Sequence, residues 1–388
     1  MISSNVTLEI SDWVYLAGFF LYQRNEYELA GKQLERALTI DPQYAAAIND
    51  LAYVHAQMRE FNRAITLMEN YVLLLPKEAN PQDSYAEILR MAGRYEEAIT
   101  HYRSALYIDP KFHSSQLGLA DTFSLMGQQK LARQEYFRAR VLAADRSTEL
   151  ADELQAALTY VRERDFAGAE LAFDGVAQNA HNLGMPLFEA QALRLKATAK
   201  MLTRPADLIV GDPPQRPKKL FFGPKRQSDL DLMLPSLEQA EEILKLTSSI
   251  SDADRLEERA RILCLKAEWL AKVSRFRDAE NALHELDSLV DESPSNDKIR
   301  RIFEGAQGAV LLYEQHYDDA LPHLEQDVGN VYSMFRLAAV YQHMGQMGLA
   351  AQQTNLITAF SQPTADEAFV VPALREQILA ESHASYRH

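Results

Sequence analysis

The sequence predicts an all-α protein, a solenoid of about nine helix-turn-helix units, which we call repeats. Three observations support this fold class. Ala and Leu are abundant while Val and Ile are sparse, which favours helix over strand. A small residue returns every 34 residues, and proline recurs with the same period. Apolar residues make up 47% of the 388 positions, enough to bury a long core.

Four series of residues share the 34-residue period. They are Ala30, Ala64, Ala98 and Ala132; Gly18, Ala52, Ala86 and Ala120; the large Leu34, Met68, Tyr102 and Tyr136; and Pro42, Pro76 and Pro110. The two small series fit places where helix axes approach within about 8–10 Å. The large residues follow the alanines by four positions, so they lie on the same helix face and fill the space above each contact.

The turns between helices are also visible in the sequence. Asp41-Pro42 and Asp109-Pro110 end one helix and begin the next, because proline is tolerated at a helix start and disfavours helix before it. Gly93 and Gly127 fall in the short turns within their repeats. Each repeat is therefore interpreted as two helices.

These residues resemble the tetratricopeptide-repeat family, whose small–large pattern has the same period. The resemblance is strong over residues 11–144 and continues in degenerate form. Later repeats are marked by Phe166-Ala169-Phe173, Phe276-Ala279-Leu283, Tyr317-Ala320-Leu324, and Ala338 with Ala350. The resemblance implies a right-handed α-solenoid, with a C-terminal capping helix near Val371–Ser382 that covers the exposed apolar end.

Four regions are expected along the chain: a regular array of four repeats over residues 1–145, degenerate repeats over 146–202, a Pro-rich basic insertion over 203–231, and degenerate repeats with the cap over 232–388. The insertion separates a first helix at Leu187–Leu202 from a second at Leu232–Leu246. Its basic residues include Arg216, Lys218, Lys219, Lys225 and Arg226. Two interpretations stay open, a partner or anion contact and a solvated or self-packing loop.

Composition excludes several classes of function. The net charge of −15 disfavours general binding to nucleic acid or anionic membrane. No stretch approaches the roughly 20 apolar residues needed for membrane insertion. The lone Cys264 gives neither a disulfide framework nor a metal cluster. We expect no cofactor and no metal, and a cytoplasmic location, or a periplasmic one if an export signal has been removed; the oligomeric state is left open.

Catalytic motifs are missing from the sequence. It has no Gly-rich phosphate loop, Gly-x-Ser-x-Gly turn or His-Glu-x-x-His pair. His316 and His323 stand seven residues apart across an expected turn, which is not a metal-ligand spacing. The sequence therefore predicts a protein that is not an enzyme.

The resemblance also implies a binding groove, since the first helix of each repeat lines the concave face in this family. Its second, fifth, ninth and twelfth positions, counted from Ser11, Ala45, Ala79 and His113, face that groove. The candidate partner-binding residues there are Tyr15, Phe19, Tyr22, Asn49, Tyr53, Asn80, Asp83, Glu87, Arg90 and Asp121. Aromatic rings beside Asn and Asp suit a peptide. Alternatively, the N-terminal segment packs on Tyr15 and Phe19.

One use of such grooves in the family is excluded by sequence. Members that grip a C-terminal carboxylate use Lys and Asn in the first repeat, Asn in the second, and Lys and Arg in the third. The matching positions here carry Tyr15 and Phe19, then Asp50, and then Asn80 and Ser84. None of these residues supplies a positive charge, so this clamp is absent. The regular opening repeats are similar to those of bacterial signalling and regulatory proteins.

The predicted function is a non-catalytic scaffold or adaptor that binds a segment of another protein or peptide in its groove. The aromatic and acidic candidates predict a segment with an apolar or aromatic anchor followed by basic residues. Two alternatives remain: a peptide- or ligand-sensing regulator, and a structural subunit of an envelope or secretion assembly.

Overall fold

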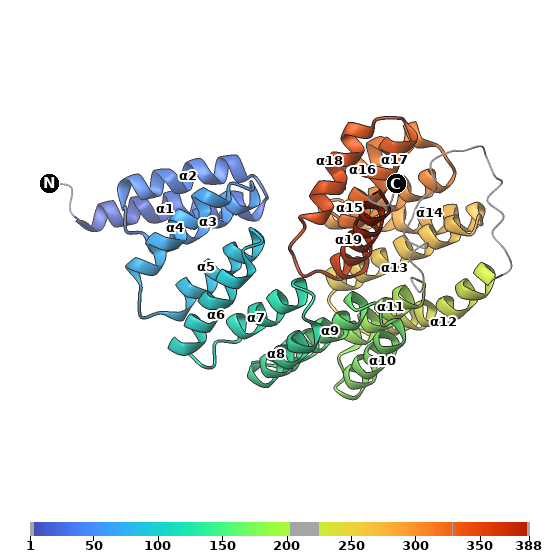
Figure 1. The fold of residues 1–388 in the computed structure, drawn as a ribbon, viewed down its shortest axis with the longest axis horizontal. Helices are drawn as coiled ribbons and strands as arrows, with labels where there is room; N and C mark the ends of the chain where they lie inside the picture. Colours follow the sequence, from blue (N-terminus) through green and yellow to red (C-terminus); the bar gives the residue numbers. More distant parts are fainter. Residues whose placement is uncertain (1–3, 202–224, 328, 386–388) are drawn as a thin grey trace. The chain divides into compact units, whose positions relative to one another are not determined.

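The computed structural model describes residues 4–201, 225–327 and 329–385 (Figure 1). Over these residues the chain forms 19 α-helices and no strand. The helices follow one another as nine antiparallel pairs and one terminal helix, which confirms the predicted all-α repeat solenoid. The chain divides into two compact units, an N-terminal unit of residues 1–144 and a C-terminal unit of residues 145–388.

The N-terminal unit contains four helix pairs of nearly equal length. Its helices are α1 Ser4–Gln23, α2 Tyr27–Ile40, α3 Ala45–Gln57, α4 Phe61–Leu74, α5 Ala79–Met91, α6 Tyr95–Ile108, α7 His113–Leu125 and α8 Gln129–Leu142. The first helices α3, α5 and α7 begin at the residues from which the repeats were counted. The second helices α2, α4 and α6 each pack both on their own partner and on the first helix of the next repeat.

The periodic residues form the core of this unit. All four alanines of the Ala30 series are fully buried, and so are the large residues four positions later. A side chain at Gly18 would come within 2.8 Å of the Leu34 side chain. At Gly118 it would overlap the Tyr102 ring. The small residues are therefore required by the close approach of neighbouring helices.

The turn inside each repeat uses one residue with left-handed backbone. Asn25, Arg59, Gly93 and Gly127 occupy the same place in successive repeats and have φ of 61°, 62°, 76° and 78°. Glycine adopts this conformation without steric cost, whereas other residues adopt it under strain. The conformation is thus imposed by the repeat and kept even where the residue is Asn or Arg.

The C-terminal unit is less regular. Its helices are α9 Arg146–Arg162, α10 Phe166–Asn182, α11 Pro186–Met201, α12 Lys225–Leu246, α13 Asp252–Lys272, α14 Phe276–Glu292, α15 Asp297–Tyr313, α16 Tyr317–Glu325, α17 Val331–His343, α18 Met347–Thr358 and α19 Ala365–Ser385. The helix α12 begins at Lys225, within the segment expected to be insertion. The helix α16 contains Pro322 and is only nine residues long.

The first helices of this unit close into a ring. Successive contacts run from α9 through α11, α13, α15 and α17, and α19 packs against both α17 and α9. The expected terminal helix is therefore present, but it starts at Ala365 and does more than cover an apolar end. Residues 367–371 of α19 are all buried, so this stretch of helix is enclosed on every side.

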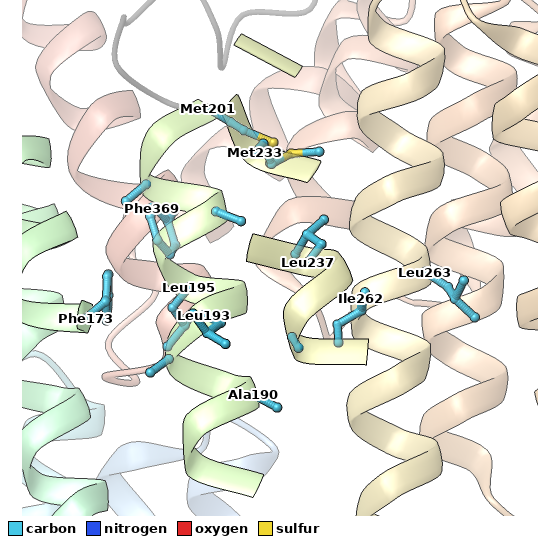
Figure 2. Close-up of a cluster of buried hydrophobic side chains, with 14 of the residues drawn as sticks. Phe173, Ala190, Leu193, Leu195, Met201, Met233, Leu237, Ile262, Leu263 and Phe369 are labelled. Atoms are coloured by element: carbon cyan, nitrogen blue, oxygen red, sulfur yellow. The ribbon is translucent and has the colours of Figure 1, made fainter. Parts of the chain in front are cut away.

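The core of the C-terminal unit joins helices that are distant in sequence. Figure 2 shows Phe173 of α10, Leu195 of α11 and Met233 of α12 in the same cluster as Phe369 of α19. Phe369 is one of the largest fully buried side chains. The helix α19 is thus part of the core rather than an appendage to it.

Candidate functional site

The ten groove candidates lie on α1, α3, α5 and α7, the first helices of the N-terminal unit, which contact one another in sequence. We call these ten positions the shared face: Tyr15, Phe19, Tyr22, Asn49, Tyr53, Asn80, Asp83, Glu87, Arg90 and Asp121. Of these, Arg90 and Asp121 are buried, Asn80 is exposed and the rest are partly buried. The shared face is therefore a partly buried surface, and two of its polar residues, Arg90 and Asp121, lie buried beneath it.

Aromatic rings form one end of the shared face. The Tyr15 ring lies 6.3 Å from the Phe19 ring and 5.0 Å from the Tyr44 ring, measured between centroids. Burial and the adjacent Asp50 carboxylate raise the pKa of Tyr15 to about 12. Tyr15 is thus held by Tyr44 and Asp50 of the second repeat, while Phe19 and Tyr22 remain partly accessible.

The middle of the shared face is a hydrogen-bonded pair between α3 and α5. The Tyr53 hydroxyl donates to Glu87 Oε2 over 2.6 Å. Burial, and then the Glu87 charge, raises the pKa of Tyr53 well above its ordinary value. The Glu87 side chain is 39% exposed, so its carboxylate can still meet a partner.

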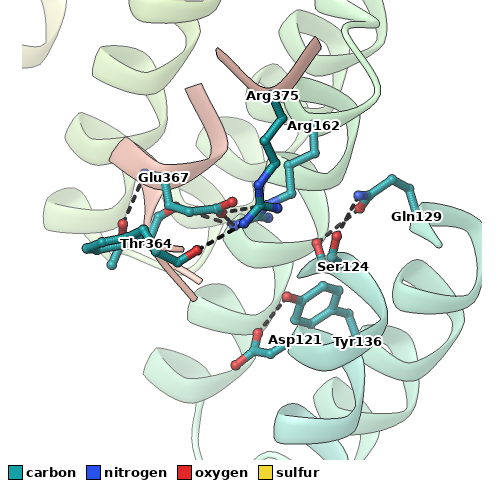
Figure 3. Close-up of polar contacts among 9 residues, drawn as sticks. Asp121, Ser124, Gln129, Tyr136, Arg162, Thr364, Glu367 and Arg375 are labelled. Atoms are coloured by element: carbon teal, nitrogen blue, oxygen red, sulfur yellow. Dashed lines mark hydrogen bonds and ion pairs between the residues drawn. The ribbon is translucent and has the colours of Figure 1, made fainter. Parts of the chain in front are cut away.

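Beneath this pair lies a buried guanidinium. Arg90 donates from Nε to the Tyr102 hydroxyl over 3.3 Å and from Nη2 to Glu87 over 3.3 Å. Burial alone would lower the pKa of Arg90, but Tyr102, Asp121 and Glu87 outweigh burial and raise it. Asp121 in turn accepts a 2.6 Å hydrogen bond from Tyr136 (Figure 3). Arg90 and Asp121 therefore support the surface from below.

Carboxylates outnumber cations on and beside this face. Asp83 accepts a 2.6 Å hydrogen bond from Ser115, yet burial raises the pKa of Asp83 to about 6. Burial also raises the pKa of Asp50, next to Asn49. Among the described residues, the buried Asn49 Oδ1 and Asp50 Oδ2 have no hydrogen-bond partner. Of the four carboxylates here, Asp83, Glu87 and Asp121 interact with the Arg90 guanidinium, whereas Asp50 interacts with Tyr15 and Asn49.

The first helices of the C-terminal unit carry matched ion pairs instead. Arg162 of α9 donates to Glu367 of α19 over 2.9 Å from Nε and 2.7 Å from Nη2, and both side chains are almost fully buried (Figure 3). The pairs Arg194–Glu258 and Arg336–Glu268 span other helices of the ring at 2.6 Å and 2.5 Å. Each of these three arginines is therefore paired with a glutamate of the same unit.

The basic candidates of the expected insertion lie mostly outside the described residues. Arg216, Lys218 and Lys219 lie outside the described residues, and Lys225 and Arg226 are the first residues of α12. Burial raises the pKa of the Cys264 thiol to about 12, which disfavours a reactive thiolate. Within residues 4–201, 225–327 and 329–385, no group of His, Cys, Asp and Glu has metal-binding geometry.

In the described part of the chain, no helix is both long and apolar enough to cross a bilayer.

Comparison with known families identifies the repeat. A family model described as a tetratricopeptide repeat matches residues 84–112, which run from α5 to the turn after α6. The chain therefore contains a tetratricopeptide repeat at these residues. Its fold is that of a general scaffold for protein–protein interaction. No curated protein is significantly similar to it in sequence.

Solved structures that resemble this chain do so at low identity. PilF of Pseudomonas aeruginosa is 20% identical, with 62% of this chain and 95% of PilF covered and a TM-score of 0.41. A tetratricopeptide-repeat protein of Parabacteroides merdae is 10% identical, with 76% and 98% covered and a TM-score of 0.40. A thermophilic repeat protein of Thermus thermophilus is 20% identical, with 47% and 98% covered and a TM-score of 0.38.

Proposed function

We propose that this protein is an adaptor that binds a polypeptide segment on the shared face of its N-terminal unit. The observation that carries the proposal is the unmatched negative charge there. Asp83 and Glu87 both interact with Arg90, Asp50 lies on the neighbouring helix α3, and burial raises the pKa values of Asp50 and Asp83. Desolvated carboxylates without enough cations favour a positively charged partner.

The arrangement along the face defines the partner more closely. Phe19 and Tyr22 of α1 offer partly accessible rings, whereas Asp83 and Glu87 of α5 offer carboxylates further along. A bound segment would place an apolar or aromatic side chain at α1 and Lys or Arg at α5.

The C-terminal unit supports the proposal by contrast. Its first-helix surface is closed by α19, and its buried arginines Arg162, Arg194 and Arg336 are each paired with a glutamate. These arginines of the ring already have carboxylate partners within the unit. We therefore assign the binding role to the N-terminal unit alone.

Selection from a displayed library of random short peptides tests the proposal on the full chain. Enriched peptides should carry an aromatic residue followed by Lys or Arg. Glu87→Lys should weaken their binding by about 1–3 kcal/mol, because it reverses a charge within the site. The matched control is Glu96→Lys, a charge reversal at an exposed position of α6.

Three results would contradict the proposal. They are enrichment of acidic peptides, equal loss of affinity in Glu87→Lys and Glu96→Lys, and binding that survives both changes undiminished. Tyr53→Phe gives a finer test, since it removes the hydroxyl that donates to Glu87 while keeping the ring. The freed carboxylate should bind a basic residue at least as tightly as before.

A further inference from the structure

The outer surface of α1 carries an uncovered apolar stripe. Trp13 is 74% exposed and Phe20 is 62% exposed, and Ile10, Leu16 and Ala17 continue the stripe on the same side of the helix. These residues are spaced by three or four positions, so they form a single face. We call Ile10, Trp13, Leu16, Ala17 and Phe20 the α1 stripe.

The 34-residue period identifies the equivalent face in the next repeat, where it packs against the preceding helix. One repeat later, Trp13, Ala17 and Phe20 correspond to Ala47, Leu51 and Val54 of α3. Those three residues are buried in one cluster with Ala30, Leu34 and Ala37 of the preceding helix α2. The α1 stripe is therefore the stacking surface of the first repeat, and it is covered in α3 but not in α1.

Another repeat of the same kind does not fit on this surface. At the position of Trp13, the later first helices carry the small residues Ala47, Pro81 and Ser115, which let the preceding helix approach closely. An indole in that place would hold the preceding helix away. The occupant must instead interleave its own bulky side chains with Trp13 and Phe20.

We propose that the α1 stripe binds the α1 stripe of a second copy of this chain, forming a two-fold dimer. An antiparallel pairing centred between Leu16 and Ala17 places Trp13 of one copy beside Phe20 of the other. The small Ala17 lies at the crossing and allows close approach of the two helices. A two-fold contact uses the same patch twice, and this stripe is self-complementary about its centre.

The charges beside the stripe are compatible with this pairing. Asp12 is its nearest described carboxylate, and it accepts a hydrogen bond from Tyr44 of its own chain. By helical rise the two Asp12 residues would stand roughly 13 Å apart along the helix axis. Because the contact is apolar and each copy carries a charge of −15, added salt should strengthen the dimer. The small patch predicts a weak dimer with a dissociation constant of about micromolar order.

Sedimentation velocity of the full chain over a dilution series tests the proposal. The wild-type chain should pass from dimer to monomer on dilution. Trp13→Asp and Phe20→Asp should each raise the dissociation constant at least about tenfold. Phe137→Asp on α8 is the matched control, because Phe137 has the same 62% exposure as Phe20 and should leave the dimer unchanged. Circular dichroism would confirm that each variant stays folded.

A cross-link tests the geometry directly. In a chain with Cys264→Ser, a cysteine introduced by Ala17→Cys should form a disulfide-linked dimer under mild oxidation, since Ala17 lies next to the two-fold axis. Phe137→Cys in the same background should not. A wild-type chain that stays monomeric at every concentration would overturn the proposal. So would a dimer that resists Trp13→Asp and Phe20→Asp, or capture of a different protein by the stripe while the chain remains monomeric.

Discussion

Both units consist of the same helix-pair repeat, but their first helices form different surfaces. In the N-terminal unit, α1, α3, α5 and α7 lie in succession, and their shared face carries more carboxylates than cations. In the C-terminal unit, α19 joins α17 to α9, and buried arginines meet buried glutamates. The difference comes from one additional helix, which turns a row of first helices into a ring.

The units also differ in how their helices begin. In the N-terminal unit, none of the helices α2 to α8 has a hydrogen bond from its first turn to a capping side chain. In the C-terminal unit, Asp145, Ser251, Asn296 and Asn330 cap α9, α13, α15 and α17. Regular period therefore defines the helix boundaries in the first unit, whereas local capping contributes to them in the second.

The two tryptophans allow the units to be followed separately. Trp13 lies on α1 of the N-terminal unit and Trp269 on α13 of the C-terminal unit. Chains carrying Trp13→Phe or Trp269→Phe would each keep one reporter. Denaturant unfolding followed by fluorescence then assigns the effect of any substitution to one unit.

The largest effect is expected from opening the ring. Glu367→Ala leaves the Arg162 guanidinium buried without its carboxylate and should destabilise the C-terminal unit by about 3–5 kcal/mol. The Trp269 transition should move to lower denaturant while the Trp13 transition stays in place. The double variant Arg162→Leu with Glu367→Leu should lose much less, since it removes both charges. An unchanged Trp269 transition in Glu367→Ala would mean that α19 does not hold the ring closed.

Overpacking a helix crossing should have the next largest effect. Ala64→Leu and Ala98→Leu place extra methyl groups at fully buried contacts and should each cost the N-terminal unit about 1–3 kcal/mol. Ala279→Leu is the counterpart in the C-terminal unit, where Ala279 is also fully buried. Denaturant melts in which Ala64→Leu or Ala98→Leu is neutral would show that the periodic alanines do not mark the crossings.

A pH effect of about 2 kcal/mol is expected from Asp83, because the difference between its folded and unfolded pKa corresponds to about 3 kcal/mol, which partial exposure to solvent reduces. Folded Asp83 keeps its proton up to a pKa of about 6, whereas an ordinary aspartate releases it near 3.8. The folded state therefore binds more protons between these values, and the free energy of unfolding falls as pH rises through them. The Asp83→Asn variant should not show this fall. Its gain in stability over the wild-type chain should therefore be larger at pH 7 than at pH 4.

The same comparison extends to the other unit. Asp327 accepts a 2.6 Å hydrogen bond from Ser333, and burial raises its pKa to about 6 as well. Asp327→Asn should therefore flatten the pH dependence of the Trp269 transition and leave the Trp13 transition unchanged. If each substitution affected both transitions equally, the units could not be treated as separate folding bodies.

The smallest effect concerns the turn residue with left-handed backbone. Arg59 has a φ of 62° where the next repeat has Gly93. Arg59→Gly should stabilise the N-terminal unit by about 0.5–1 kcal/mol, because it relieves the strain of a side chain in this conformation. Gly93→Ala should act in the opposite direction. Equal melting of wild type and Arg59→Gly would indicate that the turn relaxes at no cost.

Periodicity explains which parts of the structure could be predicted from the sequence. Ala30, Leu34 and their equivalents recur at a fixed spacing, so their burial and the starts of α3, α5 and α7 follow from the pattern. The left-handed turn at Arg59 could be inferred only by alignment with Gly93, because arginine itself does not indicate that conformation.

The closure of the ring and the burial of the polar residues could not be predicted from the 34-residue period. The helix α19 follows the last repeat, and its run Ala368–Val371 would suit a terminal cap as well as an enclosed helix. Arg90 and Asp121 occupy groove positions in the pattern, but the hydroxyls of Tyr102 and Tyr136 reach them from the second helices. Their burial depends on these neighbours and not on their own place in the repeat.

Hydrogen exchange of the full chain with a selected aromatic–basic peptide tests the central contrast between the units most directly. Amide protection reports which helices become more stable on binding. The account predicts added protection in α1, α3, α5 and α7 and none in α9 to α19. Protection concentrated in the ring of the C-terminal unit, or spread evenly over both units, would contradict it.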